Sequence, residues 1–565
     1  MKRYLFTGNL NIFKNLIKRN MFLILIIILA CVLRFYMLTT IPIGFGDDEA
    51  AFGYNAYSLL KTGHDEWGKY FPFPVFESFG DWKLALYLYL VAISQFFLGV
   101  TVFATRFPSA AIGVLAVVAT YLLTKELFDK KIALVASLLI TISPWHIAAS
   151  RNAYESDLLI FTITLGTYFF LKGLKKKYYI TLSFLIFGLS FYLYRSAWTF
   201  IPIFILFLVF LYWDSFKNLR LFLAKNIFFF LILLLPLIPT LITFRGQSRF
   251  FQESFMSGIQ NIGISNDVNE RRGDCAQFFG NLFCKLTYNK YNFYLSKYID
   301  NYIANISPQT YYQNINPTGY QSFTPRGYFY TFEFLLAIPG LIYLINIKKN
   351  STKILFVWIV AVLLAPSLTS VGNPGRLNII MPVPQIIAAI GLIYLIQMIK
   401  NNKLRLPFII LATTVVTLSF IRFVADTMSY YPKYAAMYQR YGYGELFKYV
   451  ESQKSNYSQI IVSRKSDDAK QYIHYLFFTK YDPSNYQKNA FFSRDKLGFR
   501  SVDQIDNIKF SSSVPPLNTI PIGTMIVSGN NELSSKDLRP LKTIVDPKGD
   551  VLFNVYELTA HAYEE

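Results

Sequence analysis

Three consecutive acids, Asp47, Asp48 and Glu49, follow the first apolar segment and begin a stretch with helical spacing. The spacing places apolar side chains on one helix face and ends at a glycine: Phe52, Ala56, Leu59, Leu60 and Gly63. One acid would suffice to cap this amphipathic helix, because a carboxylate accepts hydrogen bonds from its free N–H groups. Three adjacent acids repel one another, and a carboxyl whose pKa rises for that reason suits a general base or a metal ligand.

A second charged cluster, Arg151 with Glu155 and Asp157, follows the sequence Ser143-Pro-Trp-His146. Charged residues at the end of an apolar helix can simply be solvated. Ionisable residues at membrane depth are more often functional when residues of opposite charge meet there. Both interpretations stay open for this cluster.

Several basic residues stand alone beside apolar segments, and such residues could bind the phosphate of a lipid: Lys83, Arg106, Arg195, Arg245 and Arg376. Individually each could instead be an interfacial anchor that snorkels to headgroups. Arg376 is the strongest candidate, because the turn Gly372-Asn-Pro would hold it at the start of a helix.

The histidines and cysteines give weaker signals. No metal-ligand spacing accompanies His64 or His146. Cys275 and Cys284 could form a disulfide if their polar loop faces an oxidising compartment. No phosphate-binding loop appears, so ATP-driven transport by this chain alone is not expected.

The composition indicates a polytopic membrane protein that must hold these residues on its helices and loops. Hydrophobic residues make up 53% of the 565 residues and charged residues 16%. The apolar residues gather in twelve runs, several of them of the length that spans a bilayer as a helix. The formal charge of +21 lies mostly between these runs, which favours membrane orientation over nucleic-acid binding.

The charge distribution predicts eleven spanning helices, with the run at 84–103 lying in the interface as a juxtamembrane helix. The basic amino terminus is then cytoplasmic, and the run after it is an uncleaved first helix. The outer face receives residues 40–83, the turn 151–157, the loop 245–329 and everything after residue 425.

The carboxyl-terminal part changes character and predicts a small α/β domain on the outer face. Strand-like pieces occur at 459–463, 524–528 and 551–556, with helical spacing at 467–480. We therefore expect a transmembrane domain over residues 1–425, with the first outer loop at 40–107, and an extracytoplasmic domain over 426–565.

The order of these motifs resembles the GT-C superfamily of membrane glycosyltransferases, in particular the group of protein O-mannosyltransferases and lipid A aminoarabinose transferase. The matching stretches cover about the first 200 residues, with Arg376 a weaker match beyond them. They are Asp48-Glu49, Phe79-Gly-Asp81-Trp-Lys83, Arg106-Phe-Pro-Ser109, Ser143-Pro-Trp-His146 and Arg151 to Asp157. The resemblance implies the GT-C fold, a donor sugar linked to polyprenyl phosphate, and an acceptor in the cell envelope, which could be a glycan, a lipid or a protein.

The resemblance also implies roles for the candidate residues. Asp48 would be the general base of an inverting transfer, with Glu49 and Asp157 as further catalytic acids. A divalent cation could be held by Asp48 and Asp157. Residues expected to bind the donor phosphate are Lys83, Arg106 and Arg376. Residues expected to support the acceptor are Asp47, Tyr54, Arg151 and Glu155. A transporter or flippase of lipid-linked sugars is the main alternative, and a non-catalytic assembly subunit is a weaker one.

Overall fold

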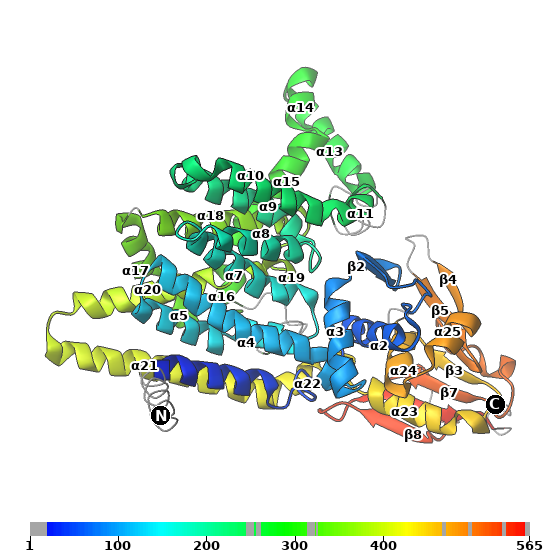
Figure 1. Ribbon diagram of the computed structural model, residues 1–565. Helices are drawn as coiled ribbons and strands as arrows, with labels where there is room; N and C mark the ends of the chain where they lie inside the picture. The colour runs from blue at the N-terminus through cyan, green and yellow to red at the C-terminus, as the bar shows by residue number, and fades with distance from the viewer. Residues whose placement is uncertain are drawn as a thin grey trace, which may run out of the picture.

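The computed structural model describes residues 20–243, 254–255, 261–313, 323, 326–347, 349–465, 470–494, 500–533 and 538–559. The basic amino terminus and Arg245 lie outside the described residues. The described chain forms a helical bundle joined at one end to a lobe that contains a β-sheet (Figure 1).

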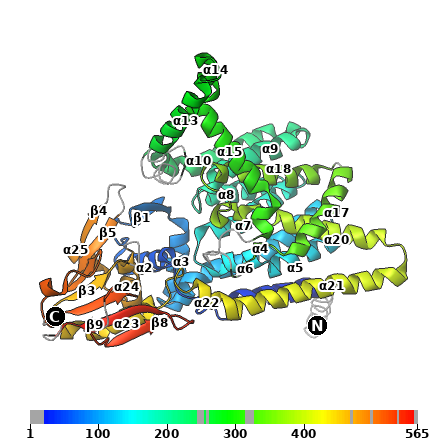
Figure 2. The same ribbon diagram turned by 180° about the vertical axis from the view of Figure 1, so that it is seen from behind.

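The bundle is built from apolar helices that run largely side by side, and the view from behind shows the same arrangement (Figure 2). Its helices are Asn20–Phe35, α4 (Val102–Leu127), α5 (Lys130–Ile142), α6 (Pro144–Arg151), α7 (Leu158–Gly173), α8 (Tyr178–Ser190), α9 (Ser196–Leu211), α10 (Arg220–Leu234), α11 (Ile238–Ile242), α17 (Thr331–Ile347), α18 (Asn350–Leu364), α19 (Pro374–Leu377), α20 (Val383–Met398) and α21 (Asn402–Ala425). The short 3₁₀ helices that matter below are η1 (Glu155–Asp157), η4 (Pro366–Leu368) and η5 (Asn378–Ile380).

Four helices of the described chain are long and apolar enough to cross a membrane, and six if each of two bent helix pairs counts as one span. Five shorter apolar helices have 10–17 residues. A helix rises 1.5 Å per residue, so the hydrocarbon core of about 30 Å requires about 20 residues. The expected number of eleven spans therefore stays a prediction.

The predicted juxtamembrane run contains α3, Leu86–Leu98, which has 13 residues and ends at Gly99. It rises about 20 Å, which is less than the thickness of the hydrocarbon core. Phe96 and Phe97 near its end are 72% and 77% exposed. The interfacial position of this run stays a prediction, because two helices in runs predicted to span, Lys130–Ile142 and Tyr178–Ser190, also have 13 residues.

Between α2 (Asp47–Thr62) and α3 lies a hairpin of β1 (Val75–Ser78) and β2 (Asp81–Leu84). Its two turn residues, Phe79 and Gly80, both have positive φ, at 60° and 80°. A two-residue turn of this kind matches the twist of the flanking strands. The hairpin therefore places Lys83 on the second strand, opposite Phe76.

The segment 261–312 is helical, and its first two helices form an arm that projects from the bundle in both views, whereas its last two lie against the bundle (Figures 1 and 2). Its helices are α13 (Asn261–Ala276), α14 (Asn281–Thr287), α15 (Lys290–Ile306) and α16 (Pro308–Tyr312). A disulfide between Cys275 and Cys284 joins the first two of them.

The carboxyl-terminal lobe contains a seven-stranded mixed sheet with the order β4-β5-β6-β3-β7-β9-β8. Its strands are β3 (Ile460–Ser463), β4 (Phe491–Arg494), β5 (Arg500–Ile505), β6 (Ile508–Ser511), β7 (Met525–Gly529), β8 (Lys542–Val545) and β9 (Val551–Glu557). Its helices are α22 (Tyr431–Ala435), α23 (Tyr443–Gln453), α24 (Gln471–Thr479) and α25 (Pro483–Asn489). Three strands and α24 lie where the sequence predicts them, whereas the four other strands were not predicted.

The main core of the lobe is shared with α2, whereas a smaller apolar cluster that contains Ile461, Ile526 and Tyr556 lies wholly within the lobe. Phe45, Ala50, Ala51, Tyr54 and Phe79 of the first outer segment pack in one cluster with apolar side chains of α23, α24 and the sheet. Segments separated by about 400 residues in the sequence therefore form one folding unit, and this unit fixes the position of α2.

Candidate active site at the start of helix α2

The helix α2 begins with all three acids in its first turn. The Glu49 side chain accepts a hydrogen bond from the Gly46 backbone N–H (3.0 Å), which is half of a capping box. Gly63 ends the helix with φ of 74°, a left-handed conformation that glycine adopts without strain. The local sequence thus explains why the helix starts and stops where predicted.

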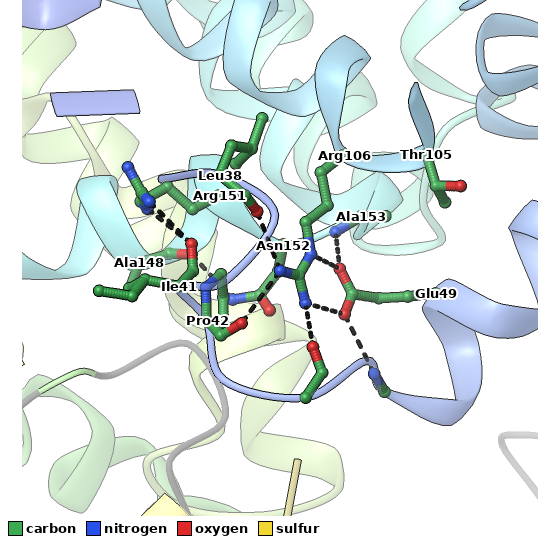
Figure 3. A network of polar contacts seen from close by, with 12 residues as sticks. Leu38, Ile41, Pro42, Glu49, Thr105, Arg106, Ala148, Arg151, Asn152 and Ala153 are labelled. Carbon is green, nitrogen blue, oxygen red and sulfur yellow. Dashed lines mark hydrogen bonds and ion pairs between the residues drawn. The ribbon is translucent and has the colours of Figure 1, made fainter. Parts of the chain in front are cut away.

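Glu49 is fully buried and forms a two-pronged ion pair with Arg106 of α4 (Figure 3). Nε and Nη2 of Arg106 each donate to one carboxylate oxygen at 2.8 Å. The Ala153 backbone N–H also donates to Glu49, at 2.9 Å. Capping and ion pairing together use the whole carboxylate, so Glu49 connects α2, α4 and the segment before η1.

Arg106 and Arg151 hold the loop between the first helix and α2 through its backbone (Figure 3). The remaining donors of Arg106 bind the carbonyls of Leu38, Pro42 and Gly44 at 2.8–3.0 Å. Arg151 binds the carbonyls of Leu33, Tyr36 and Ile41 at 2.7–3.1 Å. Both side chains are buried. The resemblance implies that Arg106 binds the donor phosphate and that Arg151 supports the acceptor. In the structure, the N–H groups of Arg106 donate to Glu49 and to backbone carbonyls, and those of Arg151 donate to backbone carbonyls.

Asp47 points to the carboxyl-terminal lobe. Arg440 donates two hydrogen bonds of 3.0 Å to its carboxylate, and His474 Nε2 lies 2.9 Å from Oδ1. The Nζ atom of Lys470 lies 3.9 Å from Oδ2. Burial alone would raise the pKa of Asp47, but the His474 hydrogen bond and the Arg440 charge outweigh it and lower that pKa. Asp47 is thus a permanently ionised docking residue in this structure.

Asp48 has a different environment from both of its neighbours. Its side chain is 40% exposed, and it forms an ion pair with Lys83 of the hairpin. Within the first turn of α2, Asp48 is therefore the acid whose carboxylate is accessible from outside the protein.

Lys83 is held in place by aromatic rings and by its strand. Its side chain is 1% exposed, and Nζ lies 5.4 Å from the ring centre of Phe52 and 5.8 Å from that of Phe79. Such contacts favour a cation. Arg195 anchors the hairpin by donating to the Trp82 carbonyl (2.6 Å). The predicted phosphate-binding lysine thus sits beside the accessible acid.

The second cluster lies next to this site, in η1 before α7. Glu155 and Asp157 are each 7% exposed. Asn378 of η5 donates to Asp157 Oδ1 at 2.7 Å, whereas Oδ2 of Asp157 is buried and has no hydrogen-bond partner. Burial raises the pKa of Asp157 to about 8, the Asn378 hydrogen bond opposes this shift, and Glu155 adds to it. Asp157 is therefore mostly protonated at neutral pH.

Two further candidates, Arg376 and Tyr54, lie outside the first turn of α2. Arg376 is partly buried in α19, which contacts η1 and leads directly into η5. It therefore lies in the segment beside the second acidic cluster. Tyr54 is buried, and its hydroxyl donates to the Tyr481 carbonyl of the lobe (3.1 Å), so it belongs to the shared core.

The described residues do not form a metal-ligand set, since nowhere among them do three His, Cys, Asp or Glu side chains gather. The Asp48 carboxylate is paired with Lys83, and His146 binds buried Arg34 at 2.6 Å. His64 Nδ1 lies 2.7 Å from the Thr62 carbonyl oxygen. The residues expected to bind a cation thus do not fit a preformed site.

Sequence reasoning missed three residues that shape this site: Arg440, His474 and Asn378. Arg440 and His474 lie about 400 residues from Asp47, and neither belongs to a local motif. Asn378 lies two residues after Arg376, so the turn that identified Arg376 as a candidate is also the signal that points to Asn378.

The comparison with known families finds one match. Residues 85–239 match the family described as dolichyl-phosphate-mannose-protein mannosyltransferase. No curated protein matches the sequence significantly.

Solved structures share the fold at low sequence identity. ArnT from Cupriavidus metallidurans, bound to undecaprenyl phosphate, is 11% identical with a TM-score of 0.52, and the match covers 97% of this chain and 99% of that one. The Archaeoglobus fulgidus oligosaccharyltransferase, tethered to an acceptor peptide, is 14% identical with a TM-score of 0.52. That match covers 82% of this chain but only 64% of the archaeal enzyme.

The matched family and both neighbours are glycosyltransferases of the GT-C type. The match over residues 85–239 and the shared fold make this chain similar to the GT-C membrane glycosyltransferases.

Proposed function

We propose that the chain transfers a sugar from a polyprenyl-phosphate donor to an acceptor hydroxyl in the cell envelope, with Asp48 as general base. The observation that carries this proposal is the pair of Asp48 and Lys83 at an accessible helix start. ArnT binds undecaprenyl phosphate on the same fold. The multi-pass chain would act at the outer face of the cell membrane, with its amino terminus in the cytoplasm.

The three acids of α2 have different roles in this proposal. Asp47 and Glu49 are each bound by an arginine through two hydrogen bonds. The side chains of Asp47 and Glu49 are 11% and 0% exposed, so neither carboxylate is open to an incoming hydroxyl. Asp48 keeps part of its carboxylate accessible and can reach an incoming hydroxyl.

The reaction then needs only a few groups. Asp48 accepts the proton of the acceptor hydroxyl, and the acceptor oxygen forms a bond to the anomeric carbon with inversion. The bond between that carbon and the donor phosphate oxygen breaks, and the phosphate leaves with the electron pair. Lys83 stabilises the charge that returns to the phosphate, because a preorganised cation costs no reorganisation.

Arg376 and the second cluster complete the proposed site. Arg376 lies in the segment that adjoins η1, where a second cation could bind the phosphate. Asp157 is held neutral at pH 7, so it can donate a hydrogen bond to a sugar or acceptor oxygen. No step requires a metal, and the cation expected at Asp48 and Asp157 enters none of them.

The test is transfer of radiolabelled sugar from polyprenyl-phosphate donors in purified membranes. We expect Asp48→Asn to reduce the rate by about 10³-fold, the range of general-base catalysis. Binding of undecaprenyl phosphate should persist in this variant, because Lys83 is unchanged.

A matched control is Asp214→Asn, whose side chain is 86% exposed and pairs with Lys217. Asp47→Asn is not a neutral control, because Asp47 binds the lobe. Equal transfer by wild type and Asp48→Asn would contradict the proposal and favour a transporter of lipid-linked sugars.

A further inference from the structure

The helix α15 has an unusual distribution of side chains, because the side that faces the bundle carries asparagines and tyrosines. Asn301 and Asn305 are 5% and 0% exposed. The Asn301 side chain donates to the Ser367 carbonyl at 3.0 Å, and that of Asn305 donates to the Ser370 carbonyl at 3.3 Å. Tyr298 and Tyr302 also reach backbone carbonyls on this side. Polar contacts therefore attach α15 to the bundle.

The apolar residues of α15 face away from the protein. They recur at intervals of three or four residues along one face, which we call the outward stripe, and they are 46–82% exposed: Tyr291, Leu295, Ile299, Ile303 and Ile306. In water such a stripe would be unfavourable, since each buried apolar side chain gains about 1.5–3 kcal/mol. A contiguous exposed patch of this kind marks a protein or membrane contact.

The third side of α15 is polar and open. Ser296, Lys297 and Asp300 line a groove of about 520 Å³ together with Asp267 and Arg271 of α13. The helix thus has one side on protein, one apolar side and one side suited to water. A helix lying in a membrane interface has this combination.

The contacts of α15 place it at the end of a candidate span. Its side chains bind the carbonyls of Val360, Leu364 and Ser367, which lie in the last turns of the span Asn350–Leu368. The end of a span lies at the boundary between hydrocarbon and headgroups.

The neighbouring helix α14 continues the apolar surface. Exposed apolar side chains lie on α14 and on the turn before it, and they are 55–81% exposed: Leu282, Phe283 and Leu286 on the helix, and Phe278 and Phe279 on the turn. Both views show α14 at the tip of the arm, away from the bundle (Figures 1 and 2). Asn281 and Lys285 of the same helix are also exposed.

We infer that α14 and α15 lie in the membrane interface, with the outward stripe in the hydrocarbon of a phospholipid monolayer and the polar groove in water. The partner of the outward stripe is lipid, because the stripe begins beside the end of a span and carries no charge. This inference does not depend on the transfer reaction.

The inference bears on the donor site through Asn305. The Gly372 backbone N–H donates to Asn305 Oδ1 at 2.9 Å, and this loop leads to Arg376. A helix held in lipid would therefore also fix the loop that carries a proposed phosphate-binding residue.

The test uses the full-length protein in nanodiscs of defined phospholipid. We expect p-benzoylphenylalanine at Leu295 to crosslink to phospholipid with a yield about fivefold above that at Ser296, because the two side chains point to different phases. Mass spectrometry of the crosslinked peptides gives both yields. Equal yields, or a crosslink from Leu295 to another protein chain, would overturn the inference.

A second measurement needs no substitution. Hydroxyl-radical footprinting of the wild-type protein in the same nanodiscs should leave Tyr291 protected, although it is 82% exposed on the protein alone. Phe491 on the sheet edge, 68% exposed, should be oxidised readily. Oxidation of Tyr291 at the rate of Phe491 would rule out burial in lipid.

Discussion

The two acidic regions of the site, the first turn of α2 and η1, differ in what surrounds their carboxylates. Each acid of α2 has a basic partner: Asp47 with Arg440, Asp48 with Lys83 and Glu49 with Arg106. In η1, Asp157 is held by the amide of Asn378, and one of its oxygens has no partner. The pKa of Asp47 is therefore lowered by its His474 hydrogen bond and the Arg440 charge, whereas burial raises the pKa of Asp157 to about 8.

The largest expected effect comes from breaking the buried pair in α2. Arg106→Met should destabilise the protein by about 3–5 kcal/mol, because Glu49 is left as a buried charge without its cation. The apparent melting temperature in detergent measures the loss. The double variant Arg106→Met with Glu49→Gln should recover part of it, since the unpaired charge is gone. An unchanged melting temperature in Arg106→Met would contradict this expectation, because it would mean that the ion pair with Glu49 does not stabilise the start of α2.

The opposite result is expected for Asp157. Its pKa in the folded protein, about 8, lies above the unfolded value near 3.8. The folded state therefore binds more protons between these values, and stability falls as pH rises from about 4 to about 8. Asp157→Asn mimics the protonated form. The free energy of unfolding of this variant, relative to that of wild type, should therefore increase by about 2 kcal/mol between pH 6 and pH 8.

Melting temperatures of both proteins at pH 6 and pH 8 test this expectation. The corresponding substitution in α2, Asp48→Asn, serves as the comparison, and it should lack this gain. Parallel pH curves for Asp157→Asn and wild type would mean that Asp157 is ionised over this pH range, like Asp47.

A smaller effect is expected at the contact between α2 and the lobe. Arg440→Met leaves Asp47 with His474 and Lys470, so α2 should stay docked but its first turn should be held less tightly. We expect transfer to fall about tenfold through kcat, because a misplaced general base loses orientation. Lys542→Met, which removes an exposed ion pair with Glu445 on the same lobe, is the control. A change confined to KM would argue against a positioning role for Arg440.

Much of the local structure could be predicted from the sequence. The start and end of α2, the apolar helices and three strands of the lobe follow from helix capping, hydrophobic periodicity and β-propensity, which are properties of neighbouring residues. The motif of the hairpin likewise placed Lys83 among the candidates. The possible disulfide between Cys275 and Cys284 is present.

The assignment of roles within the site required contacts between distant segments. Arg106 looked like a phosphate ligand in the sequence, but the loop carbonyls that occupy it belong to residues more than 60 positions away. The sheet order and the core shared by α2 and the lobe also depend on long-range packing, which no local pattern encodes.

The lengths of the apolar runs and the capping residues already indicate a membrane protein with a cluster of acids after its first helix, because both are local properties of the chain. Only the tertiary structure decided which of those acids is accessible. Asp47 and Glu49 are paired with arginines from the lobe and from α4, and Asp48 remains at the surface with Lys83. The reason is that charge pairing and burial act through space, so they depend on which segments the fold brings together.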